Sequence, residues 1–138
     1  MITLILGNKG SGKTKRLLDM CAAATNASNG CVVFIEKDNT LTFDLSHKTR
    51  LAVAEEYGID GFDALYGYIA GMCAGNYDIT DIFVDSTLKI GGRDMEALAT
   101  FVEKLSVLGE KASTNIVMSV SADPAEVPER LKGIAEEI

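Results

Sequence analysis

The chain has 138 residues, of which 47% are hydrophobic and 24% are charged, and this composition predicts a single globular domain with a buried core. The formal net charge of -7 argues against binding to nucleic acid or to an anionic membrane surface, because both present phosphates that favour a basic face. No apolar run approaches the roughly 20 residues of a membrane-spanning helix, and the apolar stretch after Met1 is too short for a secretory signal. Because the three cysteines lack zinc or redox spacing, we expect reduced, buried thiols in a cytoplasmic protein.

The predicted elements alternate between strands and helices along the chain. Short apolar runs predict strands at residues 2–6, 31–36, 50–54, 82–85 and 115–120. Apolar residues at helical spacing predict helices at residues 13–25, 61–75 and 93–108, and a weaker helix from Pro124 to the end. Because the best strands are continuous apolar runs, we expect a mostly parallel sheet covered on both faces, in a three-layer, doubly wound α/β domain over residues 1–138.

Two further patterns carry structural predictions. Leu41, Phe43 and Leu45 alternate with polar residues, which predicts a short strand or hairpin arm. Three glycines at a spacing of four in the second helix predict close packing of that helix against a neighbour; they are Gly67, Gly71 and Gly75.

A glycine-rich turn separates the first strand from the first helix. Residues 7–14 read GNKGSGKT and fit the pattern G-x-x-x-x-G-K-[ST]. Glycines allow successive backbone N–H groups to point inward around an anion, and the helix start adds the positive end of its dipole. The Lys13 side chain can then reach phosphates, and the Thr14 hydroxyl can ligate Mg²⁺. The predicted nucleotide-binding residues of this turn are Gly7, Asn8, Lys9, Gly10, Ser11, Gly12, Lys13 and Thr14.

This turn, between a strand and a helix, resembles the Walker A motif of the P-loop NTPase superfamily. The resemblance implies a P-loop fold that binds ATP with Mg²⁺, and an acidic Walker B residue at the tip of another strand. The sequence DIFVDS at residues 81–86 supplies Asp85, which would hold the metal or, alternatively, merely end a strand. ATP is the expected nucleotide because the guanine-recognition motifs of GTPases are absent.

The chain departs from many P-loop ATPases directly after Asp85. They carry a glutamate there to activate water, whereas this chain has Ser86, which can at most orient a water molecule. Hydrolysis is therefore slow or uses another base, and Glu36 is the candidate because it ends the second strand; the alternative is a solvated strand end. Together with Lys13, Glu36 and Ser86 form the candidate catalytic set.

The resemblance also extends to strand order. In RecA-like ATPases a polar residue on the strand between the two Walker strands senses the γ-phosphate, and Ser119 could do so here. We therefore expect the strand at residues 115–120 to lie between the other two, with the adjacent order of GTPases and kinases as the alternative. Residues 86–94 read STLKIGGRD and are expected to form a mobile loop. Its Lys89 and Arg93 either touch a phosphate, in this chain's own site or in that of a neighbouring subunit, or are solvated.

Three functions remain open from the sequence. The chain resembles small proteins labelled twitching-motility ATPases chiefly through the P-loop, and type II thymidine kinases in layout, but it lacks the extra domain of the larger motors and the zinc module of those kinases. The first function is a weak or partner-stimulated Mg-dependent ATPase. The second is an ATP-binding switch or adaptor without turnover, and the third is a small-molecule kinase, although the few scattered arginines argue against a kinase lid. Because the domain is small, we expect it to act through a second copy or a protein partner.

Overall fold

A computed structural model describes residues 1–40 and 44–138. The strands are β1 (Ile2–Leu6), β2 (Cys31–Glu36), β3 (Thr49–Val53), β4 (Ile79–Val84), β5 (Asn115–Val120) and β6 (Ala135–Glu137). The α-helices are α1 (Lys13–Ala27), α2 (Phe62–Gly75), α3 (Thr87–Gly91) and α4 (Met95–Ala112). Short 3₁₀ turns are η2 (Ala54–Tyr57), η3 (Pro124–Glu126) and η4 (Glu129–Leu131). The expected strand or hairpin arm at Leu41 and Phe43 lies outside the described residues.

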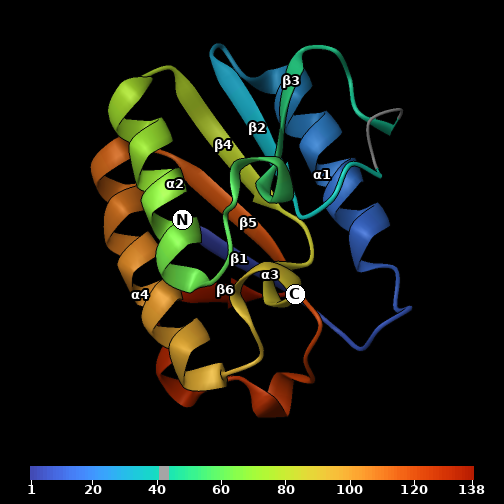
Figure 1. Cartoon of the computed structure of the whole chain (residues 1–138), viewed down its shortest axis with the longest axis vertical. Coiled ribbons are helices and arrows are strands. Elements are labelled where there is room, and N and C mark those ends of the chain that lie inside the picture. The colour runs from blue at the N-terminus through green and yellow to red at the C-terminus, as the bar shows by residue number, and fades with distance from the viewer. Residues whose placement is uncertain (41–43) are drawn as a thin grey trace.

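The six strands form one parallel sheet in the order β3-β2-β4-β5-β1-β6. Helix α1 covers one face, and α2 and α4 cover the other, which confirms the expected layered α/β domain with a parallel sheet (Figure 1). Strand β5 lies between β1 and β4, as expected, so the alternative in which β1 and β4 are neighbours is wrong. This order brings the carboxyl ends of β1, β5 and β4 to one edge of the sheet.

The central strands are continuously apolar because both of their faces are buried. In β4, Ile82 and Val84 pack into the cluster under α2 and α4, while Phe83 packs into the cluster under α1. Alternate side chains of a strand point to opposite faces, so a strand buried on both sides needs apolar residues at every position. Strand β4 pairs with β5 so that Val84 lies opposite Met118, and this register sets the position of the residues that follow each strand.

Helix α4 is defined by its cap and its buried face. The Asp94 side chain accepts hydrogen bonds from the backbone N–H groups of Glu96 and Ala97, and so satisfies two donors of the first turn. Leu98, Val102 and Leu105 are fully buried at helical spacing. The helix therefore begins at Met95, and its apolar stripe seals one face of the sheet.

The helix predicted from Pro124 to the end is wrong. The segment forms the two single turns η3 and η4, and then β6, which pairs in parallel with β1. Pro128 lacks an N–H group and disfavours helical geometry in the preceding residue, and Val127 is accordingly extended, at φ -76° and ψ 127°. A helix that starts at Pro124 cannot continue through this position.

The segment from Ser86 to Asp94 is also more ordered than expected. It contains α3 instead of a continuous loop, and α3 docks on α2 through a hydrogen bond from the Gly61 N–H to the Ile90 carbonyl at 2.8 Å. A Cβ atom on Gly91 would overlap the Phe62 ring, so this contact requires glycine. A helix this short is unstable in isolation because helix nucleation is unfavourable, and here the burial of Leu88 and Ile90 offsets that cost.

The predicted close packing of the α2 glycines is wrong. A Cβ atom added to Gly67, Gly71 or Gly75 would meet nothing within 4 Å. The spacing of four places these residues on one side of the helix, but that side faces open space.

Within residues 1–40 and 44–138, no helix combines the length and the apolarity that crossing a bilayer requires.

Candidate functional site

The turn between β1 and α1 depends on its glycines. Gly10 and Gly12 have φ angles of 85° and 86°, in the left-handed region that side chains disfavour. A Cβ atom on Gly7 would overlap the Ser11 hydroxyl oxygen. The turn is closed by a hydrogen bond of 3.1 Å from the Ser11 N–H to the Asn8 carbonyl. The chain can therefore reverse tightly directly before the helix starts at Lys13.

This turn exposes backbone donors at the start of α1. The helix has no side-chain cap at Gly12. In the described part of the chain, the N–H groups of Gly10, Gly12, Lys13 and Thr14 donate no hydrogen bond. Unpaired N–H groups and the helix dipole together place partial positive charge at this end of α1. The turn is therefore built to accept an anion.

Lys13 adds a full positive charge to this end of the helix. Its Nζ donates a hydrogen bond of 2.9 Å to the Asn8 carbonyl and lies 3.5 Å from the Ser11 hydroxyl. Partial burial lowers the pKa of the Lys13 ammonium from its ordinary value, and the nearby Asp85 carboxylate opposes this change. The side chain is thus folded back over the turn, where an incoming anion would meet it.

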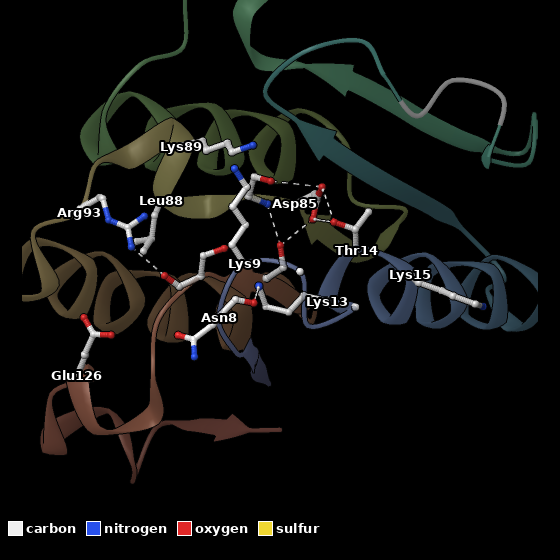
Figure 2. Close-up of a pocket in the computed structure, with 15 residues that line it drawn as sticks. Asn8, Lys9, Lys13, Thr14, Lys15, Asp85, Leu88, Lys89, Arg93 and Glu126 are labelled. Carbon is white, nitrogen blue, oxygen red and sulfur yellow. Dashed lines mark hydrogen bonds between the residues drawn. The ribbon is translucent and has the colours of Figure 1, made fainter.

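Asp85 follows β4 directly and is the centre of a hydroxyl cluster (Figure 2). The Thr14 hydroxyl donates to both carboxylate oxygens, at 3.1 Å to Oδ1 and 3.3 Å to Oδ2. The Ser119 hydroxyl, from the neighbouring strand β5, donates to Oδ1 at 2.8 Å. Asp85 is only 7% exposed, so these bonds fix the direction of its carboxylate. The structure thus brings together three of the residues that the sequence singled out.

Ser86 is held in the same cluster. Its backbone N–H donates to the Ser119 hydroxyl oxygen at 2.8 Å, and its own hydroxyl lies 3.5 Å from Asp85 Oδ2. Its φ of 53° is in the left-handed region, which is uncommon for a residue with a side chain. Ser119 therefore connects Asp85 to the backbone that leads into α3.

A cavity of about 740 Å³ lies at the carboxyl edge of the sheet, between the glycine-rich turn, α3 and the segment after β5. Gly7 and Ser11 shape the turn without lining the cavity. The sequence-predicted residues that do line it are Asn8, Lys9, Gly10, Gly12, Lys13, Thr14, Asp85, Ser86 and Ser119. Residues that are distant in sequence therefore share one site.

Glu36 lies beside this site and not at a solvated strand end, so that alternative is wrong. It is 2% exposed, and its Oε1 accepts a hydrogen bond of 2.8 Å from the Thr40 N–H. It lines a smaller cavity of about 210 Å³ that shares Thr14 and Asp85 with the larger one. Because β2 and β4 are neighbours, their carboxyl ends place Glu36 and Asp85 at the same edge.

Lys89 and Arg93 also line the large cavity, from α3 and the residues after it (Figure 2). Arg93 donates a hydrogen bond of 3.0 Å from Nη2 to the Ser121 carbonyl, which ties the start of α4 to the segment after β5. Both side chains are exposed. The interpretation that these residues touch a phosphate is therefore compatible with their positions.

Glu126 lines the cavity and was not expected there. The sequence pattern places Glu126 in a C-terminal helix and therefore does not assign it to the site. The sequence DPAE at residues 123–126 carried a signal, because an acidic residue followed three positions later by glutamate is typical of a capping box. The structure forms that box: the Asp123 N–H donates to Glu126 Oε1 at 3.0 Å. Lys15, Leu88 and Ser121 were the other unexpected lining residues.

Thr14 and Asp85 are the groups that fit a divalent cation. Among the residues that the structure describes, no three or more His, Cys, Asp or Glu side chains gather at a metal-binding distance. Mg²⁺ commonly takes only one or two protein ligands and completes its shell with phosphate oxygens and water. A hydroxyl and a carboxylate 3.1 Å apart, beside a turn that accepts anions, match that mode of binding. No family model and no curated protein matches the chain.

Proposed function

We propose that the chain is a P-loop protein that binds Mg·ATP in the 740 Å³ cavity and hydrolyses ATP slowly on its own. One observation carries the proposal: Thr14 and Asp85, 71 positions apart, are joined by a hydrogen bond at the wall of a cavity that Lys13 also lines. A phosphate-binding turn alone would accept many anions. Its combination with a buried carboxylate at the tip of β4, two strands away in the sheet, favours a phosphate-bound metal as well.

Each part of the site has a separate task in this proposal. The N–H groups of the turn and the Lys13 ammonium would hold the phosphate oxygens. The Thr14 hydroxyl and the Asp85 carboxylate would ligate Mg²⁺, which neutralises phosphate charge when bound. Ser119 would orient Asp85 through their hydrogen bond of 2.8 Å. These groups position and neutralise the triphosphate but do not activate water.

We expect slow hydrolysis because the residue after Asp85, Ser86, is a weak base for the activation of water. Ser86 offers a hydroxyl with no charge to attract a proton, so it is a poor base. Glu36 is the candidate base in the adjoining cavity, and it would take a proton from a water molecule there. A protein partner or a second copy that adds a catalytic group would accelerate this reaction. The proposal therefore includes low basal turnover that a partner stimulates.

A nucleotide-binding switch without turnover is the second candidate. It is favoured by the hydrogen bond from the Thr40 N–H to Glu36 Oε1, which occupies part of the candidate base. It is also favoured by the hydrogen bond from the Ser86 N–H to Ser119, which links the site to α3. A switch needs such a link more than it needs a base. The two candidates differ in one observable, the release of inorganic phosphate.

Calorimetric titration with Mg·ATP tests binding. We expect saturable binding to the wild-type chain and a dissociation constant raised by about 10- to 100-fold in Lys13→Ala, because a charge-assisted contact to phosphate is lost. Lys111→Ala, which removes an exposed lysine at the far end of α4, is the matched control and should bind normally. Equal affinities in the three proteins would refute the proposed site. If binding is confirmed, the release of inorganic phosphate distinguishes the two candidates. Release by the wild-type chain that is abolished in Glu36→Gln would support the ATPase, and no release by the wild-type chain would support the switch.

A further inference from the structure

We infer that this site recognises the triphosphate with its metal and does not discriminate between bases, so that it accepts nucleoside triphosphates of any base. The inference rests on the proposed function and narrows it to a class of ligand. It is carried by the lining of the 740 Å³ cavity, by the distribution of charge around it, and by the existing bonds of two charged lining residues, Arg93 and Glu126.

Apolar side chains are almost absent from the lining of the cavity. Leu88 is the single apolar side chain among its lining residues in the described chain, and none of them is aromatic. Pockets that select a base normally bury it among hydrophobic and aromatic side chains. The tyrosines of α2 serve elsewhere: Tyr66 lies under Lys104, with Nζ 4.2 Å from the ring centre, and Tyr68 lines a separate groove. A base would gain little from packing in this cavity.

The charge around the cavity instead favours phosphates. Lys9, Lys13, Lys89 and Arg93 line it, against the carboxylates of Asp85 and Glu126. Lys15 also lines the cavity, but its side chain points away along α1, where it pairs with Asp19 at 3.0 Å (Figure 2). The cavity is therefore a basic region in a chain of net charge -7. Such a concentration of charge attracts polyanions and is indifferent to the base they carry.

Two charged side chains of the cavity lining, those of Arg93 and Glu126, already have partners. Arg93 donates to the Ser121 carbonyl, and Glu126 Oε1 accepts the Asp123 N–H that closes the capping box. A site discriminates strongly between bases when buried groups are left unpaired by the wrong ligand. Here such a penalty would be small, because Arg93 and Glu126 are exposed and already bonded within the protein.

The test is calorimetric titration of the full chain, in excess Mg²⁺, with ATP, GTP, CTP, UTP and inorganic tripolyphosphate. We expect dissociation constants for the four nucleotides within about threefold of one another, and tripolyphosphate within about tenfold of ATP. Sites that read a ligand by hydrogen bonds to buried groups discriminate by about 10⁴-fold. Lys13→Ala should weaken all five ligands by the same factor, whereas Lys111→Ala should weaken none.

The outcomes separate this inference from the proposed function. A preference above about tenfold for one nucleotide over the other three, or for ATP over tripolyphosphate, would overturn the inference while binding itself stands. If none of the five ligands binds, the proposed function fails as well. If tripolyphosphate binds and the four nucleotides bind equally, both are supported. A preference below tenfold supports the inference because it lies far under the discrimination of a base-reading site.

Discussion

At the scale of single residues, Ser119 is the most informative side chain of the site. Its hydroxyl donates to Asp85 Oδ1 and accepts the Ser86 N–H, each at 2.8 Å, and it is 2% exposed. Ser119→Ala would leave a buried acceptor and a partly buried donor without this partner, at a cost of about 1–3 kcal/mol. We expect denaturant unfolding to show this loss. We also expect nucleotide binding to require more Mg²⁺, because Asp85 would be less firmly oriented.

Ser121→Ala is the matched control for this prediction. It removes the same atom two positions later, but the hydrogen bond at Ser121 uses only its backbone carbonyl. Its free energy of unfolding should stay within about 0.5 kcal/mol of wild type. If Ser119→Ala unfolds as the control does and needs no additional Mg²⁺, then Ser119 does not orient Asp85.

The residues of the site differ in how far the sequence could predict their positions. The turn at residues 7–14 and Asp85 could be placed, because a motif and a strand end locate them without knowledge of distant contacts. Glu36 could be named but its burial could not, because its burial depends on chain segments that pack around the end of β2. Glu126 was missed because its place depends on the path of the chain after β5, which no periodic pattern records. The catalytic roles of Lys13, Glu36 and Ser86 stay predictions.

At the scale of elements, the contact of α3 with α2 is expected to depend on Gly91. A Cβ atom there would overlap the Phe62 ring, which is itself packed against Phe101 with ring centres 5.0 Å apart. Gly91→Ala should therefore destabilise the protein by about 1–3 kcal/mol, because a close-packed ring must move. Denaturant unfolding measures this loss.

For Gly71→Ala we predict the opposite change in the free energy of unfolding, although this variant also replaces a glycine with alanine. Gly71 lies inside α2, and an added Cβ would meet nothing within 4 Å. Alanine should then stabilise the helix, by up to about 1 kcal/mol, because it restricts the unfolded chain and favours helical geometry. If the two variants change the free energy of unfolding in the same direction, the Phe62 contact does not determine the effect.

The elements also show where prediction from sequence ends. Strands β1, β2, β4 and β5 could be predicted because burial on both faces demands continuous apolar runs, and α4 because its stripe is periodic. The strand β6 could not, since Ala135–Glu137 is short and mostly polar, and only its backbone pairing with β1 makes it a strand. Helix α3 was missed for a similar reason: docking on α2, not its own pattern, makes its five residues helical.

At the scale of the whole molecule, charge is distributed unevenly. The chain carries a net charge of -7, yet the large cavity is lined by an excess of cationic side chains. An approaching polyphosphate is therefore repelled by the molecule as a whole and attracted by one region. Both effects act through solvent, because Lys89 and Arg93 are exposed. Dissolved salt should therefore screen both interactions. The screening length falls from about 30 Å at 0.01 M to about 3 Å at 1 M ionic strength.

The affinity for Mg·ATP should consequently depend on salt. We expect the dissociation constant, measured by calorimetry at fixed Mg²⁺, to rise by about tenfold between about 0.05 M and 0.5 M KCl, because close attraction at the cavity outweighs distant repulsion. Lys89→Ala should bind more weakly at low salt and show a shallower salt dependence, since it removes one of the attracting charges. Lys111→Ala should keep the wild-type slope. An affinity that rises with salt would mean that repulsion by the acidic surface dominates, and that the basic cavity does not set the strength of binding.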